Sequence, residues 1–396
     1  METLVHARGP EPSTATQALF IAEAFGFGPS SKLLILARRL LQHQPMGTTF
    51  LGDGCAHELC KDGPFDAVVR ADPTDLRRGG ALYRQLAAAD VLVSAMEFSP
   101  MGLASEMGLT TVLFDSLLWL WPSLPCRAGA IDWYVCQNFL GVKERAAALH
   151  RGQRFLVVPP LTMAEDGEWE SGDTVVLNFG GMDNPYAAAG PVLAYAANML
   201  EAVLAECQAL SLELQVCGRD WVLQRLRSRF RADSLRFDTL SPEAFTGRLR
   251  QARCLITSPG LETIYEAFTM GVPAYLLPPQ NNSQAYQAQR IQAEVPGLSG
   301  LQWHELRPTD VLDRDLAPAD LTRRLLGFAG ELGSDPGAAG TLRGSIHEFL
   351  EKDAAAHARQ CRHQFGFIER MRAGADLQIS DLPSIASLVR KPSRSR

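Results

Sequence analysis

Short apolar runs alternate with helical stretches along the first half of this chain. The runs lie at 18–23, 48–51, 67–70, 91–94, 110–114, 130–136 and 155–158. Between them, the spacing of apolar residues predicts an amphipathic helix over 32–43 and a second helix over 79–89. Strands that are apolar on both faces are typical of a parallel sheet covered by helices on each side. The pattern therefore predicts an α/β fold with a doubly wound sheet.

A second alternation follows a break in this pattern. The break, 159–172, is rich in proline and acidic residues and predicts an interdomain linker. The strands predicted beyond it lie at 174–179, 212–217, 235–237, 254–257 and 274–277, and the helices at 192–206, 221–230, 242–250, 321–332 and 344–371. We therefore expect a first domain over 1–163, a second over 174–343, a final helix over 344–372 and a loose tail over 373–396.

Composition and charge narrow the class of protein. A chain of 396 residues exceeds what one hydrophobic core usually supports, which favours two domains. The formal net charge of −6 argues against a nucleic-acid partner, because phosphate backbones select basic surfaces. The eight cysteines lack a paired C-x-x-C spacing, which argues against a zinc site. A polar start without a signal peptide, and no apolar run long enough to span a bilayer, predict a cytoplasmic protein.

The segment 254–284 combines several spaced signals of ligand binding. A buried strand runs into the small-residue turn Ser258–Gly260, and a helix follows. A helix N-terminus without bulky side chains presents free N–H groups and a positive dipole end, which suits a phosphate. Glu266 lies one helical turn beyond Thr263, within reach of the hydroxyls of a ribose. The amide-rich loop 278–284 offers hydrogen bonds to a sugar, so the segment predicts a nucleotide-sugar site.

This segment resembles the donor-binding segment of GT-B glycosyltransferases. Its layout is most similar to the enzyme that adds N-acetylglucosamine in peptidoglycan synthesis, and to macrolide-type and glucuronosyl relatives. The resemblance implies two Rossmann-like domains that face a central cleft, with C-terminal helices returning to the first domain. It also implies that the first domain binds the acceptor and the second binds the nucleotide sugar. The donor-binding residues that follow are Ser258, Pro259, Gly260 and Thr263 at the diphosphate, Glu266 at the ribose, and Gln280, Asn281 and Gln284 at the sugar. Glu262, in the same helix, is a further donor-binding candidate. Many members carry an acidic or basic residue near Ser283 or Gln284, so the identity of the sugar stays open.

Two further glycine-containing pairs are candidates for donor contact. Gly180 and Gly181 end the first strand of the second domain and resemble the loop that touches the diphosphate in this superfamily. Their alternative is a structural turn. Cys217 and Gly218 hold a similar position after the next strand, where they lie near a uridine base or simply pack closely.

The loop after the first strand has three interpretations. In GT-B relatives a glycine-rich first loop faces the donor diphosphate and closes over the acceptor, which assigns Gly26, Gly28 and Ser30 to the acceptor side. The alternatives are a tight turn with a serine N-cap, and a partial dinucleotide-binding fingerprint with Asp53 as its acidic residue.

A catalytic base is expected from the first domain, since the acceptor sits there. Glu97 and Asp115 both follow apolar strands, whose ends face the crevice of a parallel sheet. Each alternatively caps a backbone N–H or pairs with an arginine, and His57 is a third candidate. We expect no metal and no cofactor, because helix dipoles and N–H donors can carry the charge of the leaving diphosphate.

The first domain also resembles the cytosylglucuronate and hydroxymethylcytosylglucuronate synthases of peptidyl-nucleoside antibiotic pathways. The resemblance rests on 114–122, on 133–137 and on the Asp-Ser-Leu step at 115–117. It implies transfer of glucuronate from UDP to N1 of free cytosine, a small acceptor. The alternatives are a nucleotide-sugar hydrolase or epimerase on the same frame, and a nucleotide-sugar-binding protein without turnover. The oligomeric state stays open.

Overall fold

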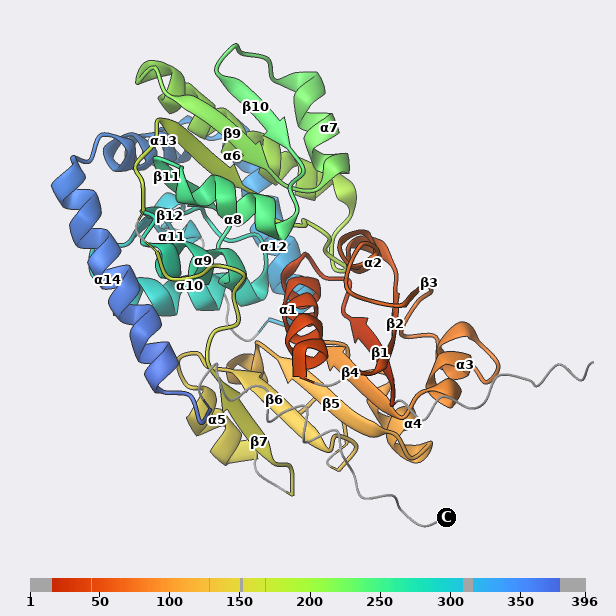
Figure 1. Ribbon diagram of the computed structural model, residues 1–396. Coiled ribbons are helices and arrows are strands. Elements are labelled where there is room, and N and C mark those ends of the chain that lie inside the picture. The colour runs from red at the N-terminus through yellow and green to blue at the C-terminus, as the bar shows by residue number, and fades with distance from the viewer. Residues whose placement is uncertain are drawn as a thin grey trace, which may run out of the picture.

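Two parallel sheets form the framework of the protein, as the computed structural model of residues 16–43, 45–127, 129–149, 152–167, 169–308 and 316–377 shows (Figure 1). The first sheet has seven strands in the order β3-β2-β1-β4-β5-β6-β7. These strands are β1 (Gln17–Ala22), β2 (Gly47–Gly52), β3 (Ala67–Arg70), β4 (Val91–Ala95), β5 (Thr110–Asp115), β6 (Trp133–Gln137) and β7 (Phe155–Val158). Their connections hold α1 (Gly28–His43), α2 (Gly54–Cys60), α3 (Ala81–Ala88), α4 (Met101–Glu106), the 3-10 turn η1 (Leu118–Leu120) and α5 (Val142–Leu149).

The second sheet has six strands in the order β10-β9-β8-β11-β12-β13. These strands are β8 (Thr174–Asn178), β9 (Glu213–Cys217), β10 (Leu235–Asp238), β11 (Cys254–Thr257), β12 (Ala274–Leu276) and β13 (Ser299–Gly300). The helices are α6 (Ala189–Ala209), α7 (Asp220–Arg229), α8 (Pro242–Arg250), α9 (Leu261–Met270), α10 (Asn282–Glu294), α11 (Trp303–Leu306), α12 (Pro318–Glu331), the 3-10 turn η2 (Leu332–Ser334), α13 (Pro336–Leu350) and α14 (Ala354–Ala373). Two doubly wound sheets confirm the predicted fold class.

Each sheet is buried on both faces, which explains why its central strands are apolar throughout. In β1, Phe20 packs in one hydrophobic cluster with residues of α1, whereas Leu19 and Ile21 belong to the cluster on the opposite face. In the second sheet, Ile256 of β11 packs toward α6 and α12, while Leu255 faces α9. In both sheets the chain first winds one way and then the other, with switch points at β1/β4 and β8/β11. Ligands bind beside such switch points, at the carboxyl ends of the strands.

The C-terminal helices return to the first domain, as predicted. Figure 1 shows α14 running from the second sheet toward α5 and β7. At its end, Asn138 Nδ2 donates to the carbonyl of Met371 at 2.6 Å, and Asp376 N donates to the carbonyl of Val157 at 2.8 Å. The prediction of one helix over 344–372 is wrong, because the chain breaks at 351–353. Asp353 starts a new helix there by accepting a hydrogen bond from Ala356 N at 2.7 Å. Of the predicted tail, 378–396 lies outside the described residues.

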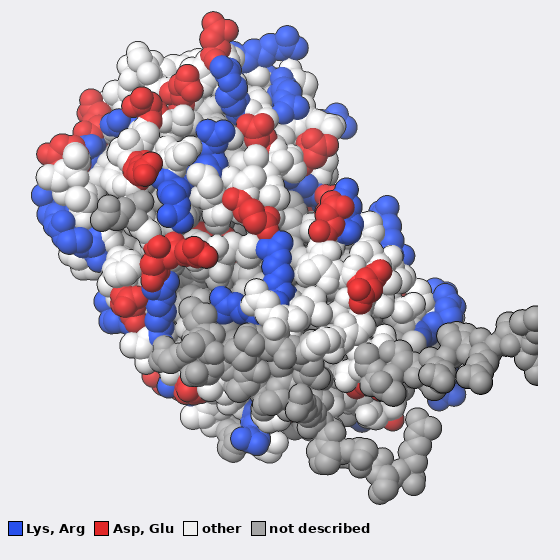
Figure 2. All heavy atoms as spheres, in the orientation of Figure 1, with Lys and Arg blue, Asp and Glu red and all other residues white. Residues whose placement is uncertain are grey.

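Charged side chains of both signs are interspersed on the face shown in Figure 2. This mixed surface agrees with the small negative net charge and offers no broad basic face there. In the described part of the chain, no helix combines the length and apolar character that crossing a membrane requires. A cytoplasmic location stays a prediction.

Candidate active site in the domain cleft

One cavity is lined by both domains at the carboxyl ends of their strands. The first domain contributes Glu23, Phe25, Gly26, Phe27, Gly28, Pro29, Ser31, Lys32, Leu59, Met96, Ser116, Leu117 and Gln137. The second contributes 178–184, Cys217, Gly218, Leu240, Pro242, Phe245, Ser258, 260–263, Glu266, Gln280, Asn281, Ser283, Gln284 and Gln287. Segments far apart in the sequence meet here because parallel strands all end at the same edge of a sheet. Except for Pro259, every residue predicted to bind the donor lies in this lining.

The N-terminus of α9 opens into the cavity with several groups free to donate. The first intrahelical bond is Ile264 N to the carbonyl of Gly260, at 3.1 Å, so the amides of 261–263 have no partner within the helix. Asn178 Nδ2 donates to Thr263 Oγ1 at 3.0 Å, which leaves the hydroxyl hydrogen of Thr263 to point elsewhere. Asn178, which sequence reasoning missed, therefore orients the predicted diphosphate-binding hydroxyl.

Hydrogen bonds connect the turn before α9 to two neighbouring segments of the site. Tyr195 OH donates to the carbonyl of Pro278 at 2.8 Å and lies 3.1 Å from Ser258 Oγ. Since tyrosine has one hydroxyl proton, Ser258 donates to Tyr195, and Gln280 Nε2 donates to Ser258 at 3.4 Å. The Ser258 hydroxyl thus positions Gln280 instead of pointing a free proton at a diphosphate.

Pro259 lies outside the lining. Its carbonyl accepts a hydrogen bond from the buried side chain of Gln287. Gln287 on α10 therefore joins the two donor segments, and nothing in the sequence pattern had marked it.

Two carboxylates one helical turn apart line the cavity from α9. Glu266 is 3 % exposed, and burial raises its pKa well above the usual range. Glu262 raises that pKa further, while Lys32 of α1 lowers it. Glu262 itself forms an ion pair with Lys32, which also donates to the carbonyl of Leu161. Lys32, a buried cation from the first domain, was predicted only as the start of an amphipathic helix.

The predicted sugar-binding loop is shorter than expected because α10 begins inside it. Asn281 is the N-cap, and its Oδ1 accepts from Gln284 N at 3.0 Å. Gln284 Oε1 accepts from Gln280 N at 3.2 Å. The oxygens of both amides are therefore occupied within the described structure, and their NH2 groups are the ends that can meet a sugar hydroxyl.

The two glycine loops face each other across the cleft. A Cβ on Gly181 would lie 2.8 Å from the Gly26 backbone, so only glycine permits this approach. Gly26 and Gly180 adopt φ of +64° and +66°, which also favours glycine. Gly28 begins α1 beside them, and Cys217 and Gly218 line the cavity from β9.

Ser30 and Asp53 lie outside the cavity. Ser30 is fully buried in α1, and its neighbour Ser31 lines the cavity instead. Asp53 precedes α2 and pairs with Arg70 at 2.9 Å, with both side chains exposed. The structure therefore does not favour Asp53 as the acidic residue of a dinucleotide site.

The sequence-predicted bases do not reach the cavity lining. Asp115 is fully buried and accepts from Leu117 N at 2.6 Å, Trp121 Nε1 at 2.8 Å and Tyr134 OH at 2.6 Å. Burial raises its pKa to about 6 even though these donors oppose the shift. Glu97, which is 8 % exposed, accepts from Ser99 N at 2.9 Å. His57 lies within α2 and is also absent from the lining. The capping alternative therefore fits both carboxylates.

Glu23 is the carboxylate that the first domain presents to the cavity. It follows β1 directly and is half-buried. Burial, with Glu97 and Asp115 nearby, raises its pKa to about 8. Sequence reasoning missed it because the residue was assigned to the end of the first strand. A carboxyl group that titrates near neutral pH in a cleft is suited to proton transfer.

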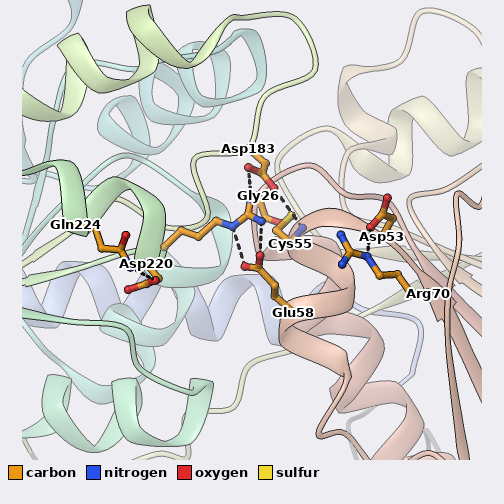
Figure 3. A network of polar contacts seen from close by, with 9 residues as sticks. Gly26, Asp53, Cys55, Glu58, Arg70, Asp183, Asp220 and Gln224 are labelled. Carbon is orange, nitrogen blue, oxygen red and sulfur yellow. Dashed lines mark hydrogen bonds and ion pairs between the residues drawn. The ribbon is translucent and has the colours of Figure 1, made fainter.

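A network of ion pairs joins the domains beside this cavity (Figure 3). Arg219 follows β9 and donates to Glu58 on α2 at 2.6 and 2.8 Å. It also pairs with Asp183, which accepts from Cys55 N at 3.2 Å. Among the described residues, no group of three or more His, Cys, Asp or Glu side chains is arranged to hold a metal. Independence from metals stays a prediction.

The fold matches solved structures over most of their length. Os79 from O. sativa in complex with U2F and trichothecene has a TM-score of 0.54 and 12 % identity, over 94 % of this chain and 100 % of that one. UGT89C1 of Arabidopsis thaliana complexed with quercetin has a TM-score of 0.53 and 12 % identity, over 95 % and 100 %. UGT71G1 of Medicago truncatula complexed with UDP-glucose has a TM-score of 0.51 and 14 % identity, over 94 % and 98 %. At such identities the similarity shows the fold, which is that of GT-B glycosyltransferases. No protein-family model and no curated protein sequence matches the chain.

Proposed function

We propose that this protein is a glycosyltransferase that moves a sugar from a UDP-linked donor to a small acceptor. The observation that carries the proposal is the position of Glu23. Glu23 lines the same cavity as Thr263, Glu266 and Gln280, from the opposite domain. A base on one side and a nucleotide-sugar cradle on the other are the two halves that a direct displacement requires.

Each step of such a displacement has a residue in the cavity that can perform it. Glu23 takes the proton from an N–H or O–H of the acceptor while that atom forms a bond to C1 of the sugar. The bond between C1 and the diphosphate oxygen breaks, and UDP leaves with the electron pair. The amides of 261–263 and the Thr263 hydroxyl stabilise the charge on the diphosphate, so the chemistry proceeds without a metal.

Glucuronate is our best proposal for the sugar, and N1 of cytosine for the acceptor atom. Phe25 and Phe27 line the cavity and could stack on a planar pyrimidine, whose polar edge Gln137 and Ser116 could bind. The proton on N1 must leave during the transfer, which suits a carboxylate base such as Glu23. The resemblance to the cytosylglucuronate synthases supports the same pair of substrates and a place in antibiotic biosynthesis.

Turnover is tested with UDP-glucuronate and UDP-glucose, each with and without cytosine, followed by mass spectrometry. A cytosine adduct that forms only with both substrates supports the proposal. Sugar release at the same rate without acceptor would instead identify a hydrolase, and binding of UDP without any product would identify a non-catalytic protein.

Donor binding is tested with Glu266→Ala. We expect UDP affinity, measured by calorimetry, to fall on the order of tenfold or more, because the ribose hydroxyls lose the buried carboxyl group of Glu266 as their hydrogen-bond partner. Glu106→Ala, an exposed glutamate at the end of α4, serves as the matched control and should leave affinity unchanged. Equal affinities of wild type and Glu266→Ala would refute the ribose assignment.

A further inference from the structure

Lys32 is a cation buried between the two domains at the wall of the cavity. Its residue exposure is 2 %, and its ammonium group donates to the carbonyl of Leu161. Its ionic partner is Glu262, which is on α9 of the other domain and whose side chain is 13 % exposed. A buried ion pair loses the hydration of both charges, so its presence calls for an explanation beyond stability.

The side chains that line the cavity include more acidic than basic groups, which is unfavourable for binding an anionic donor. Among the described residues that line it, Lys32 is the one cation, whereas Glu23, Asp183, Glu262 and Glu266 are acidic. The diphosphate of a UDP-sugar carries two negative charges. The cation that would attract those charges is already neutralised by Glu262.

Glu262 occupies a position where an anion is favoured. It lies in the first turn of α9, where the amides of 261–263 and the helix dipole attract negative charge. Apart from its ion pair with Lys32, neither carboxylate oxygen has a hydrogen-bond partner among the described residues. Among the side chains that the structure describes, Lys32 is therefore the one that holds this carboxylate, and an anion that binds Lys32 more strongly can displace it.

We propose that Lys32 binds an anionic group of the sugar donor, and that Glu262 occupies this position until the donor arrives. This inference rests on the proposed function and deepens it. When the donor binds, the ammonium group of Lys32 turns to the donor, and the carboxylate of Glu262 takes up a proton from solvent. The anionic group is either the diphosphate or a carboxylate carried by the sugar, and both have the chemistry that an ammonium group recognises.

The electrostatics around Glu262 support proton uptake. Burial raises its pKa, and Lys32 is the group that opposes this shift. The charged groups that face it are Lys32 from α1 and Glu266 from its own helix. The helices α8 and α14 and the strand β12 also pack against α9, and none of their described charged groups shifts either carboxyl. Losing Lys32 to the donor would favour the neutral acid further, so donor affinity should rise as the pH falls.

The experiment measures binding of UDP-glucose, whose diphosphate stays doubly ionised between about pH 5.5 and 8.5, by calorimetry in two buffers of different ionisation enthalpy. For the wild type we expect proton uptake and tighter binding at the lower pH. The same measurement is made with UDP-glucuronate. In Glu262→Gln we expect the donor whose anionic group contacts Lys32 to bind more tightly, on the order of tenfold, because Lys32 has lost its competing partner, and the proton uptake of this site to disappear. Glu243→Gln is the matched control, since Glu243 forms a more exposed interdomain pair with Arg38 at 2.5 Å.

Lys32→Met and UDP-glucuronate separate the two sources of the anionic group. If the diphosphate contacts Lys32, this variant weakens UDP-glucose and UDP-glucuronate alike. If a sugar carboxylate contacts Lys32, only UDP-glucuronate is weakened, and only that donor shows the effect of Glu262→Gln. Uridine, which lacks phosphate and sugar acid, should bind the wild type and Glu262→Gln equally.

Two results would overturn the inference in distinguishable ways. A folded Glu262→Gln protein that binds both donors as the wild type does, or more weakly, shows that the ion pair is only a structural link between domains. Failure of the wild type itself to bind either UDP-sugar overturns the proposed function, and the inference with it. Thermal unfolding of each variant confirms that it is folded, and the Glu262→Gln comparison stands even if Lys32→Met does not fold.

Discussion

At the scale of single residues, Glu23 carries the chemistry of the proposal. Replacing it with glutamine keeps the shape of the side chain and removes the base. We expect Glu23→Gln to lower kcat by about 10²–10⁴-fold and to leave the affinity for UDP unchanged, since all the proposed donor contacts except Lys32 lie on the other domain. Steady-state kinetics and calorimetry measure the two quantities separately.

The pH profile checks the same assignment independently. A general base must be ionised, and the pKa of Glu23 is raised to about 8 by burial and by the neighbouring Glu97 and Asp115. The wild-type rate should therefore rise with pH up to about 8 and then level off. Glu97→Gln removes one of the charges that raise this pKa, so its profile should move to lower pH. A profile that Glu97→Gln does not move would contradict the assignment.

The sequence predicted Glu97 and Asp115 as candidate bases, whereas the carboxylate in the cavity lining of the first domain is Glu23. Like both candidates, Glu23 lies at the end of a strand, where parallel strands face the cleft. Asp115, however, accepts hydrogen bonds from Trp121 and Tyr134, which lie in a following turn and a neighbouring strand. Those hydrogen bonds hold the carboxylate of Asp115 in the protein interior, away from the cavity. Whether a carboxylate at a strand end faces the cavity depends on such hydrogen-bond partners from other parts of the chain, and no local sequence pattern reveals them.

At the scale of elements, the first loop of each domain must approach the other closely. A Cβ at Gly181 would lie 2.8 Å from backbone atoms of Gly26 and Phe27, which cannot move aside as a flexible side chain can. We expect Gly181→Ala to lower the free energy of unfolding by about 1–3 kcal/mol and to weaken UDP-glucose binding. Thermal unfolding and calorimetry test both expectations.

The control is Gly247→Ala within α8, where an added Cβ meets no atom within 4 Å. It should leave both quantities nearly unchanged or raise stability slightly, because alanine favours helix. If both alanine variants have the same stability and the same affinity for UDP-glucose, the close approach of the two loops contributes to neither quantity.

Element positions were predicted well wherever a strand is buried on both faces. The strand Cys254–Thr257 has the predicted bounds, since a run of apolar residues between turns allows few alternatives. The break between α13 and α14 was missed, although Asp353 three residues before Ala356 is an N-cap signal. The same signal at Asn281 was interpreted as a sugar contact, because a capping amide and a ligand-binding amide look alike in sequence.

At the scale of the whole molecule, the two domains are joined by contacts that the sequence could not predict, because each pairs residues far apart in the chain. Tyr265 OH donates to the carbonyl of Asn138 at 2.9 Å, deep in the interface. Lys32 and Glu262 meet at the cavity wall, and Arg219 meets Glu58 closer to the surface. One buried hydrophobic cluster also contains residues of both domains, among them Phe139 and Phe268. Apolar packing therefore joins the domains beside these polar contacts.

Removing Arg219 should loosen the domain arrangement. The guanidinium of Arg219 pairs with Glu58 from one domain and Asp183 from the other, so Arg219→Ala leaves two carboxylates facing each other. We expect a larger radius of gyration in small-angle X-ray scattering without donor. Arg229→Ala, which removes an exposed pair with Glu201 inside the second domain, is the control and should scatter as the wild type does.

The pH dependence of stability tests whether this contact acts through charge. The hydrogen bond from Arg219 lowers the pKa of Glu58 below its usual value of 4.5. A carboxyl group whose pKa is lower in the folded state stabilises that state above its unfolded pKa, and the contribution is lost as the pH falls below it. The stability difference between wild type and Arg219→Ala, measured by denaturant unfolding, should therefore be full near neutral pH and shrink below about pH 4.5. A difference that stays constant on acidification would assign the effect of Arg219 to packing of its side chain against α2 instead of to its charge.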